Sequence, residues 1–132
     1  MAYVIPTLRI RDRATLQHWG EAFGLKLHAV YPEHGDSVDH AQLRLGTGWI
    51  MAGTVREDGP GQPPGQASCY WVLDDPGAVD AIHERALAAG ASEIQAPHDP
   101  DYGGRACSLA DREGNLWSFG TYAPQTTPGD AS

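Results

Sequence analysis

The chain has 132 residues, of which 41% are hydrophobic and 20% are charged, and its formal net charge is −8 at pH 7. This length suits one domain that buries a core without disulfides or a structural metal. The acidic excess argues against nucleic-acid binding, because it repels phosphate backbones. No apolar run approaches the roughly 18 residues of a membrane helix. The N-terminus lacks a signal-peptide pattern and only two cysteines are present, so we expect a cytoplasmic protein without a disulfide framework.

One structural pattern occurs twice along the chain. The first copy, about residues 3–55, begins with an alternating, β-rich strand that ends at Ile10. Helical spacing of apolar residues over 13–23, followed by Gly24, predicts a helix and its end. Three further strands are predicted over 25–31, 38–45 and 49–54. The Gly- and Pro-rich stretch 56–66 is then a linker, because it suits neither a helix nor a central strand.

The second copy, about residues 67–122, has the same order of elements. A strand over 69–73 precedes a helix that opens at Asp75-Pro76 and ends at Gly90. A short strand, a loop and a hairpin follow, and their predicted ranges are 92–95, 97–104, 105–109 and 115–122. The tail, 123–132, has the composition of a disordered segment. The sequence therefore predicts a single α+β domain over 1–122, built from two βαβββ units.

Three motifs connect this pattern with a known family: Phe23-Gly24, the turn Asp111-Arg-Glu-Gly-Asn115 and the ending Leu116 to Tyr122. With them, the chain resembles the vicinal oxygen chelate superfamily from about Tyr3 to Tyr122. That superfamily includes glyoxalase I, extradiol dioxygenases and bleomycin resistance proteins. Its closing turn usually reads Asp-Pro-x-Gly, and here Arg112 replaces the proline. The resemblance implies two βαβββ repeats whose curved sheets join through their first strands into a cup-shaped mixed sheet.

The resemblance also indicates where a metal would bind. Metal-dependent members carry one ligand, typically His or Glu, on the first and last strand of each copy. The corresponding positions here hold Ile5, Met51, Ser68 and Ser118. A hard divalent ion needs imidazole nitrogen or carboxylate oxygen, which these side chains do not supply. We therefore predict that the chain has no metal and no cofactor.

Without a metal, the resemblance points to the branch that binds a small molecule between the two chains of a homodimer, where aromatic side chains sandwich planar rings. The residues predicted to face the ligand by strand alternation are Thr7, Trp49, Met51, Ser68, Tyr70 and Ser118. Trp49 and Tyr70 would be stacking surfaces, and the hydroxyl groups would be polar contacts. The alternative interpretation of Trp49 is that it only fills space in a small cup.

The loop before the hairpin is a second candidate region. Tyr102 and Arg105 flank Gly103 and Gly104, which permit movement, so these side chains could close over a ligand. Asp99 and Asp101 could attract a cation, but a plain connecting loop would have a similar composition. His18, His28, His34, His83 and His98 show no paired spacing on one face and are expected at the surface.

These observations favour a metal-independent small-molecule binding protein, in which a homodimer sequesters a planar or cationic ligand such as an antibiotic. The alternative is a divalent-metal-dependent lyase or dioxygenase of the same superfamily, with the metal held by His40 or His98 through a shifted register. A third hypothesis is a cofactor-free enzyme that uses an acid or base in the pocket. Nothing in the sequence selects its catalytic residue, and the ligand's identity depends on pocket shape.

Overall fold

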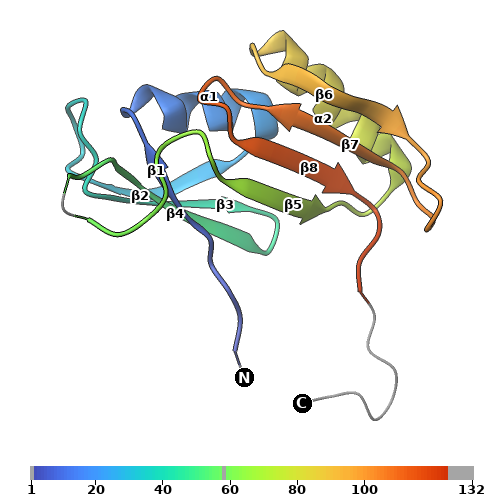
Figure 1. Cartoon of the computed structure of the whole chain (residues 1–132), viewed down its shortest axis with the longest axis horizontal. Coiled ribbons are helices and arrows are strands. Elements are labelled where there is room, and N and C mark those ends of the chain that lie inside the picture. Colours follow the sequence, from blue (N-terminus) through green and yellow to red (C-terminus); the bar gives the residue numbers. More distant parts are fainter. Residues whose placement is uncertain (1, 58, 125–132) are drawn as a thin grey trace.

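The computed structural model describes residues 2–57 and 59–124, which form two βαβββ units (Figure 1). The elements of the first unit are β1 (Thr7–Ile10), α1 (Ala14–Phe23), β2 (Lys26–Tyr31), β3 (His40–Leu45) and β4 (Gly48–Thr54). Those of the second are β5 (Ser68–Val72), α2 (Pro76–Ala88), β6 (Ser92–His98), β7 (Ala106–Ala110) and β8 (Leu116–Gly120). The predicted α+β class and the duplicated order of elements are confirmed.

Each unit contributes one four-stranded mixed sheet. The strand orders are β1-β4-β3-β2 and β5-β8-β7-β6, and in both sheets the first strand of the unit runs parallel to the last. The remaining neighbours are antiparallel. β1 and β5 are therefore edge strands, and within the described residues they do not pair with each other. The expected joining of the sheets through their first strands does not occur inside one chain.

One core lies between the units, on the side of each sheet that carries a helix. In both sheets buried apolar residues alternate along the strands with more exposed ones. Phe23 of α1 stacks on Trp117 of β8 with ring centroids 4.4 Å apart, and Trp19 lies 5.3 Å from the same ring. α1 and α2 also contact each other, on the same side of the molecule (Figure 1). The units thus pack through their helix-covered faces, which leaves the opposite face of each sheet uncovered.

The predicted helix ends are confirmed. Gly24 ends α1 with a φ of 77°, a left-handed conformation that glycine adopts without steric cost. At α2 the side chain of Asp75 accepts a hydrogen bond from the backbone N–H of Ala78, and Pro76 occupies the first turn. Among the described residues, no helix is long and apolar enough to cross a membrane.

Most strand boundaries lie within two residues of the prediction, and two differ by more. β1 begins only at Thr7, because Pro6 has no amide hydrogen for a ladder and the residues before it extend into solvent, where Val4 is 85% exposed. β6 continues to His98 instead of ending at Gln95. Pro97 is tolerated there because β6 is the edge strand of its sheet. The predicted disordered tail falls almost entirely outside the described residues.

The closing turn between β7 and β8 is organised by one buried carboxylate, that of Asp111. Its Oδ1 accepts hydrogen bonds from the backbone N–H groups of Glu113, Gly114 and Asn115. Its Oδ2 accepts from the indole N–H of Trp19 at 2.8 Å and of Trp117 at 3.0 Å, and from the Asn115 amide. Asp111 therefore fixes the turn and also binds it to the helix of the other unit.

His18 is a correction to the sequence analysis, which placed it at the surface. It is only 3% exposed, and its Nε2 accepts a hydrogen bond from the backbone N–H of Arg112. The covering residues come from the second unit, so the periodicity of α1 alone did not reveal the burial.

Candidate binding site

The uncovered sheet faces carry most of the residues that the sequence analysis selected. We call them the first open face, which includes Thr7, Lys26, Gln42, Arg44, Trp49 and Met51, and the second open face, which includes Ser68, Tyr70, Val72, Ser108, Leu116 and Ser118. Thr7 pairs with Met51 across β1 and β4, and Tyr70 pairs with Ser118 across β5 and β8. These two pairs occupy equivalent places in the repeats.

Trp49 forms the centre of the first open face. Arg44 is its partner on β3, and the guanidinium carbon lies 5.6 Å from the centroid of the indole ring. The ring of His28, at a bulge in β2, meets the indole edge-on with centroids 5.1 Å apart. Gln42 lies beside Met51, and its amide nitrogen is 3.1 Å from a ring nitrogen of His40. Trp49 is thus a partly exposed aromatic surface surrounded by polar and basic groups.

Tyr70 has a fixed position on the second open face. Its hydroxyl donates a hydrogen bond of 2.7 Å to the backbone carbonyl of Tyr122. Its ring covers Gly120 so closely that a Cβ at this glycine would overlap the phenol. Burial raises the pKa of Tyr70, with a further contribution from Tyr102, so the phenol remains protonated and able to donate. Tyr70 is therefore a preformed aromatic surface.

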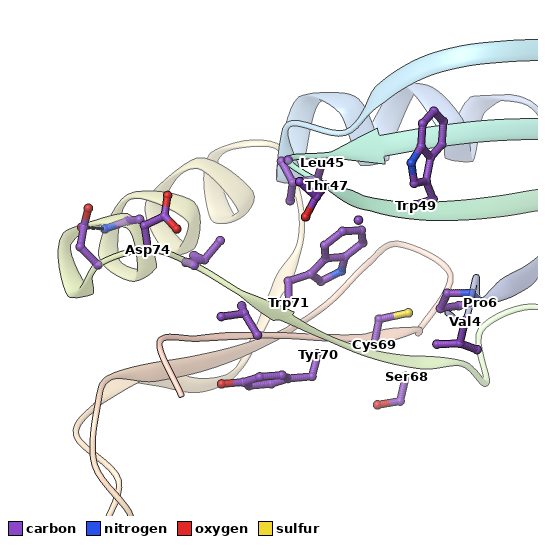
Figure 2. A pocket seen from close by; sticks show the side chains of 16 residues that line it. Val4, Pro6, Leu45, Thr47, Trp49, Ser68, Cys69, Tyr70, Trp71 and Asp74 are labelled. Atoms are coloured by element: carbon purple, nitrogen blue, oxygen red, sulfur yellow. Dashed lines mark hydrogen bonds between the residues drawn. The ribbon is translucent and has the colours of Figure 1, made fainter. Parts of the chain in front are cut away.

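A groove of about 770 Å³ separates the two units along β5 (Figure 2). Its walls are the N-terminal arm at Val4 and Pro6, the β3–β4 turn, and both sides of β5. Trp71 crosses it to the turn, where a Cβ on Gly48 would come within 2.7 Å of the indole ring. Gly48 thus permits the contact between Trp71 and the β3–β4 turn.

Three of the eight predicted site residues, Trp49, Ser68 and Tyr70, line this groove. They do not converge on one point within the chain. In Figure 2 the ring of Trp49 extends from β4 away from β5, whereas Ser68 and Tyr70 leave β5 on the side opposite to Trp71. Thr7, Met51 and Ser118 lie on the open faces outside the groove. The hydroxyl of Ser118 is hydrogen-bonded to that of Ser108 at 2.8 Å.

The two loop candidates have other contacts. Tyr102 is 62% exposed and packs edge-on against Tyr122, with centroids 5.1 Å apart. Arg105 donates hydrogen bonds to the carboxylates of Asp80 on α2 and Asp99, at 2.9 and 3.0 Å. Its guanidinium therefore has acidic partners on the helix side of the sheet, away from the second open face.

Sequence reasoning missed that Trp71 and Cys69 line the groove. By strand alternation Trp71 faces the core, and the indole does lie parallel to Trp117, 6.1 Å away. The missing signal is the edge position of β5, since both faces of an edge strand can reach an opening beside it. Burial raises the pKa of Cys107 to about 11 and also raises that of Cys69, so neither thiol is activated as a nucleophile.

The superfamily's metal positions do not fit a metal here. Of these, Met51 offers a thioether, Ser68 and Ser118 offer hydroxyls, and Ile5 offers no donor atom, which is not a ligand set for a hard divalent ion. Within residues 2–57 and 59–124, no three His, Cys, Asp or Glu side chains gather closely enough to hold an ion.

Comparisons with known proteins agree with this fold. TioX from Micromonospora sp. ML1 is 27% identical, with a TM-score of 0.72 and coverage of 96% of this chain and 100% of that chain. A glyoxalase-related enzyme from Fulvimarina pelagi is 19% identical, with a TM-score of 0.74 and coverage of 100% and 96%. The fosfomycin resistance protein FosX from Listeria monocytogenes, solved with Mn(II), is 14% identical, with a TM-score of 0.68 and coverage of 92% and 90%.

No curated protein matched the chain. The family model described as the Glyoxalase/Bleomycin resistance protein/Dioxygenase superfamily matches residues 10–119. Together with the two βαβββ units, this match shows that the chain belongs to the glyoxalase/bleomycin resistance protein/dioxygenase superfamily.

Proposed function

We propose that this protein binds a planar small molecule without a metal and sequesters it, as an antibiotic-binding protein does. The observation that carries the proposal is which residues occupy the superfamily's metal-binding positions in this chain. They hold no metal ligands, while the neighbouring positions hold the aromatic rings of Trp49 and Tyr70. Aromatic surfaces with a few polar groups are typical of small-molecule sites.

We further infer that the complete site requires a homodimer. β1 and β5 are edge strands, and Tyr70 and Val72 on β5 are 45% and 53% exposed. Such an edge presents unpaired backbone groups and apolar surface that another strand can cover. Placing β1 of one copy beside β5 of another would bring the first open face of one chain to the second open face of its partner. The ligand would then lie between Trp49 and Tyr70 of the partner subunit.

In this arrangement the ligand's rings stack on Trp49 from one side and on Tyr70 of the partner subunit from the other. The hydroxyls of Ser68 and Ser118 lie on the same face as Tyr70 and supply hydrogen-bond donors and acceptors. Stacking of the ligand on Tyr70 has a low entropic cost, because the hydrogen bond to Tyr122 already holds this ring in place.

The test is a titration of tryptophan fluorescence with a panel of planar aromatic compounds that includes cationic antibiotics. We expect at least one compound to quench the parent protein, and we expect Trp49→Ala to lose that quenching. Leu87→Ala, which removes a partly exposed apolar side chain from α2, is the matched control and should behave like the parent. Identical responses of the parent and Trp49→Ala to every compound would contradict the proposal.

Native mass spectrometry of protein purified without chelators tests the homodimer and the metal independence. We expect a dimer without a stoichiometric metal, and we expect Val72→Asp to yield a monomer that no longer binds the ligand. Stoichiometric Zn, Ni, Fe or Mn that survives dialysis would overturn metal independence and favour a lyase or dioxygenase.

A further inference from the structure

The basic residues of the strands lie in one sheet. β1 to β4 carry Arg9, Lys26 and Arg44 and contain no Asp or Glu, although the whole chain has a net charge of −8. β5 to β8 contain no Lys or Arg, and their one acidic residue is Glu93. The first sheet is therefore locally basic in an acidic protein.

Two of these basic groups lie on the same open face as Trp49: Arg44 next to the indole, and Lys26 on the far side of Arg44. Arg44 lies over the indole ring and pairs in register with Lys26 on β2. A guanidinium that packs on an aromatic face keeps its N–H groups in its own plane, where they can bind a carboxylate through two parallel hydrogen bonds. Both side chains are exposed, so a ligand on Trp49 can reach them.

Neither group has an acidic partner among the described residues. The four ion pairs found there involve Arg11, His83 and Arg105, not Lys26 or Arg44. Like charges directly opposite each other on neighbouring antiparallel strands destabilise the pair. An anion bound between Lys26 and Arg44 would relieve this repulsion.

We propose that the ligand is a planar aromatic anion, whose ring stacks on Trp49 and whose acidic group binds Arg44 and Lys26. This inference rests on the proposed function and specifies its ligand class. It also replaces the cationic ligand that the overall negative charge suggested, because the field at the site is set by the nearest charges and distant surface charges are screened by salt.

The experiment uses three probes with the same ring and different charge: 2-naphthoate, 2-naphthamide and 2-naphthylmethylammonium. Binding to the full-length protein is measured by isothermal titration calorimetry at low salt. We expect 2-naphthoate to bind about tenfold or more tightly than the amide, as for a charge-assisted hydrogen bond, and we expect the ammonium to bind most weakly. The preference for 2-naphthoate should decrease as salt is added.

Variants locate the effect. Arg44→Gln should bring the affinity for 2-naphthoate closer to that for the amide, with only Lys26 left to bind the carboxylate, and leave amide binding unchanged, whereas Trp49→Ala should weaken all three. Arg11→Gln removes the same charge from a side chain that is 60% exposed near the closing turn and should behave like the parent. Thermal melting of each variant confirms that it is folded.

The outcomes separate the two proposals. If the amide or the ammonium binds as tightly as 2-naphthoate and Trp49→Ala still abolishes binding, the anionic ligand class is wrong and the proposed function stands. If no probe binds, or if Trp49→Ala has no effect on any of them, both proposals fail. A preference for 2-naphthoate that Arg44→Gln does not change would overturn the assignment to Arg44.

Discussion

Two regions of this molecule place tryptophan beside charged groups, and they differ in whether those groups have partners. At the closing turn, the indole N–H groups of Trp19 and Trp117 both donate to the Asp111 carboxylate, and both rings are fully buried. On the first open face, Trp49 is partly exposed, and the described residues give its neighbour Arg44 no carboxylate partner. Aromatic content alone therefore does not identify a binding site. What makes Trp49 a candidate is its partial exposure beside a basic group that has no ion pair among the described residues.

The largest loss of stability should follow from removing the Asp111 carboxylate, the common partner of the two indole groups at the closing turn. Asp111→Ala leaves two buried indole N–H groups and the backbone N–H groups of Glu113 and Asn115 without the carboxylate acceptor, whereas that of Gly114 keeps the backbone carbonyl of residue 111. We expect a loss of about 3 to 5 kcal/mol in the free energy of unfolding. Urea denaturation measures it. Asp101→Ala, in an exposed loop, should change stability by no more than about 0.5 kcal/mol. A loss below about 1 kcal/mol for Asp111→Ala would mean that the network is not what joins the units.

A smaller loss of stability should follow from disturbing Tyr70, whose position on the second open face is fixed. Gly120→Ala places a Cβ against the ring of Tyr70, and we expect a loss of about 1 to 3 kcal/mol because the ring must move and release the Tyr122 carbonyl. In the double variant with Tyr70→Ala, the glycine substitution should cost almost nothing. Denaturation of the four proteins of this cycle gives the coupling. Additive losses would show that Tyr70 does not rest on Gly120.

Much of the fold could be predicted because its signals are local. Gly24 ends α1, Asp75 and Pro76 begin α2, and alternation along β3, β7 and β8 identifies the buried side. The closing turn was recognisable for a similar reason, since Asp111 and Asn115 act within a few residues of each other. Signals of this kind require no knowledge of what packs on them.

The site was predicted less completely, because it depends on contacts between distant segments. Strand alternation selected Trp49 and Tyr70, but it did not reveal that they point away from each other in one chain. Arg105 was expected to contact the ligand because it follows the loop glycines 103 and 104, and the sequence did not reveal its carboxylate partner Asp80 on the preceding helix. The position of His18 was predicted from its own helix, although the second unit covers it, and the contact of Trp71 with Gly48 of the first unit has no local signal. Packing between the units supplies this information, and sequence periodicity does not contain it.

The pH dependence of stability distinguishes the buried region from the open faces. Burial, assisted by Arg112, lowers the pKa of His18 from 6.5. Below that pH the unfolded chain therefore binds a proton that the folded chain does not, and stability falls as pH decreases until the folded pKa is reached. We expect His18→Gln to flatten this slope, and His34→Gln, in an exposed loop, to leave it unchanged. Denaturation curves measured between neutral and mildly acidic pH provide the comparison. A slope retained in His18→Gln would assign the dependence to other groups.

The smallest loss of stability should come from Trp49→Ala, the substitution at the residue that we propose as the main ligand contact. Trp49→Ala removes a partly exposed ring whose neighbours on the open face, Arg44 and His28, are themselves exposed. Little apolar surface returns to water, and no buried polar group loses a partner, so we expect a loss of about 1 kcal/mol or less. Trp117→Ala, which empties part of the core, should cost about 3 kcal/mol or more. Denaturation measures both losses. If Trp49→Ala proved as costly as Trp117→Ala, the ring would be part of the folding core, and its loss of ligand binding could no longer be attributed to a missing contact.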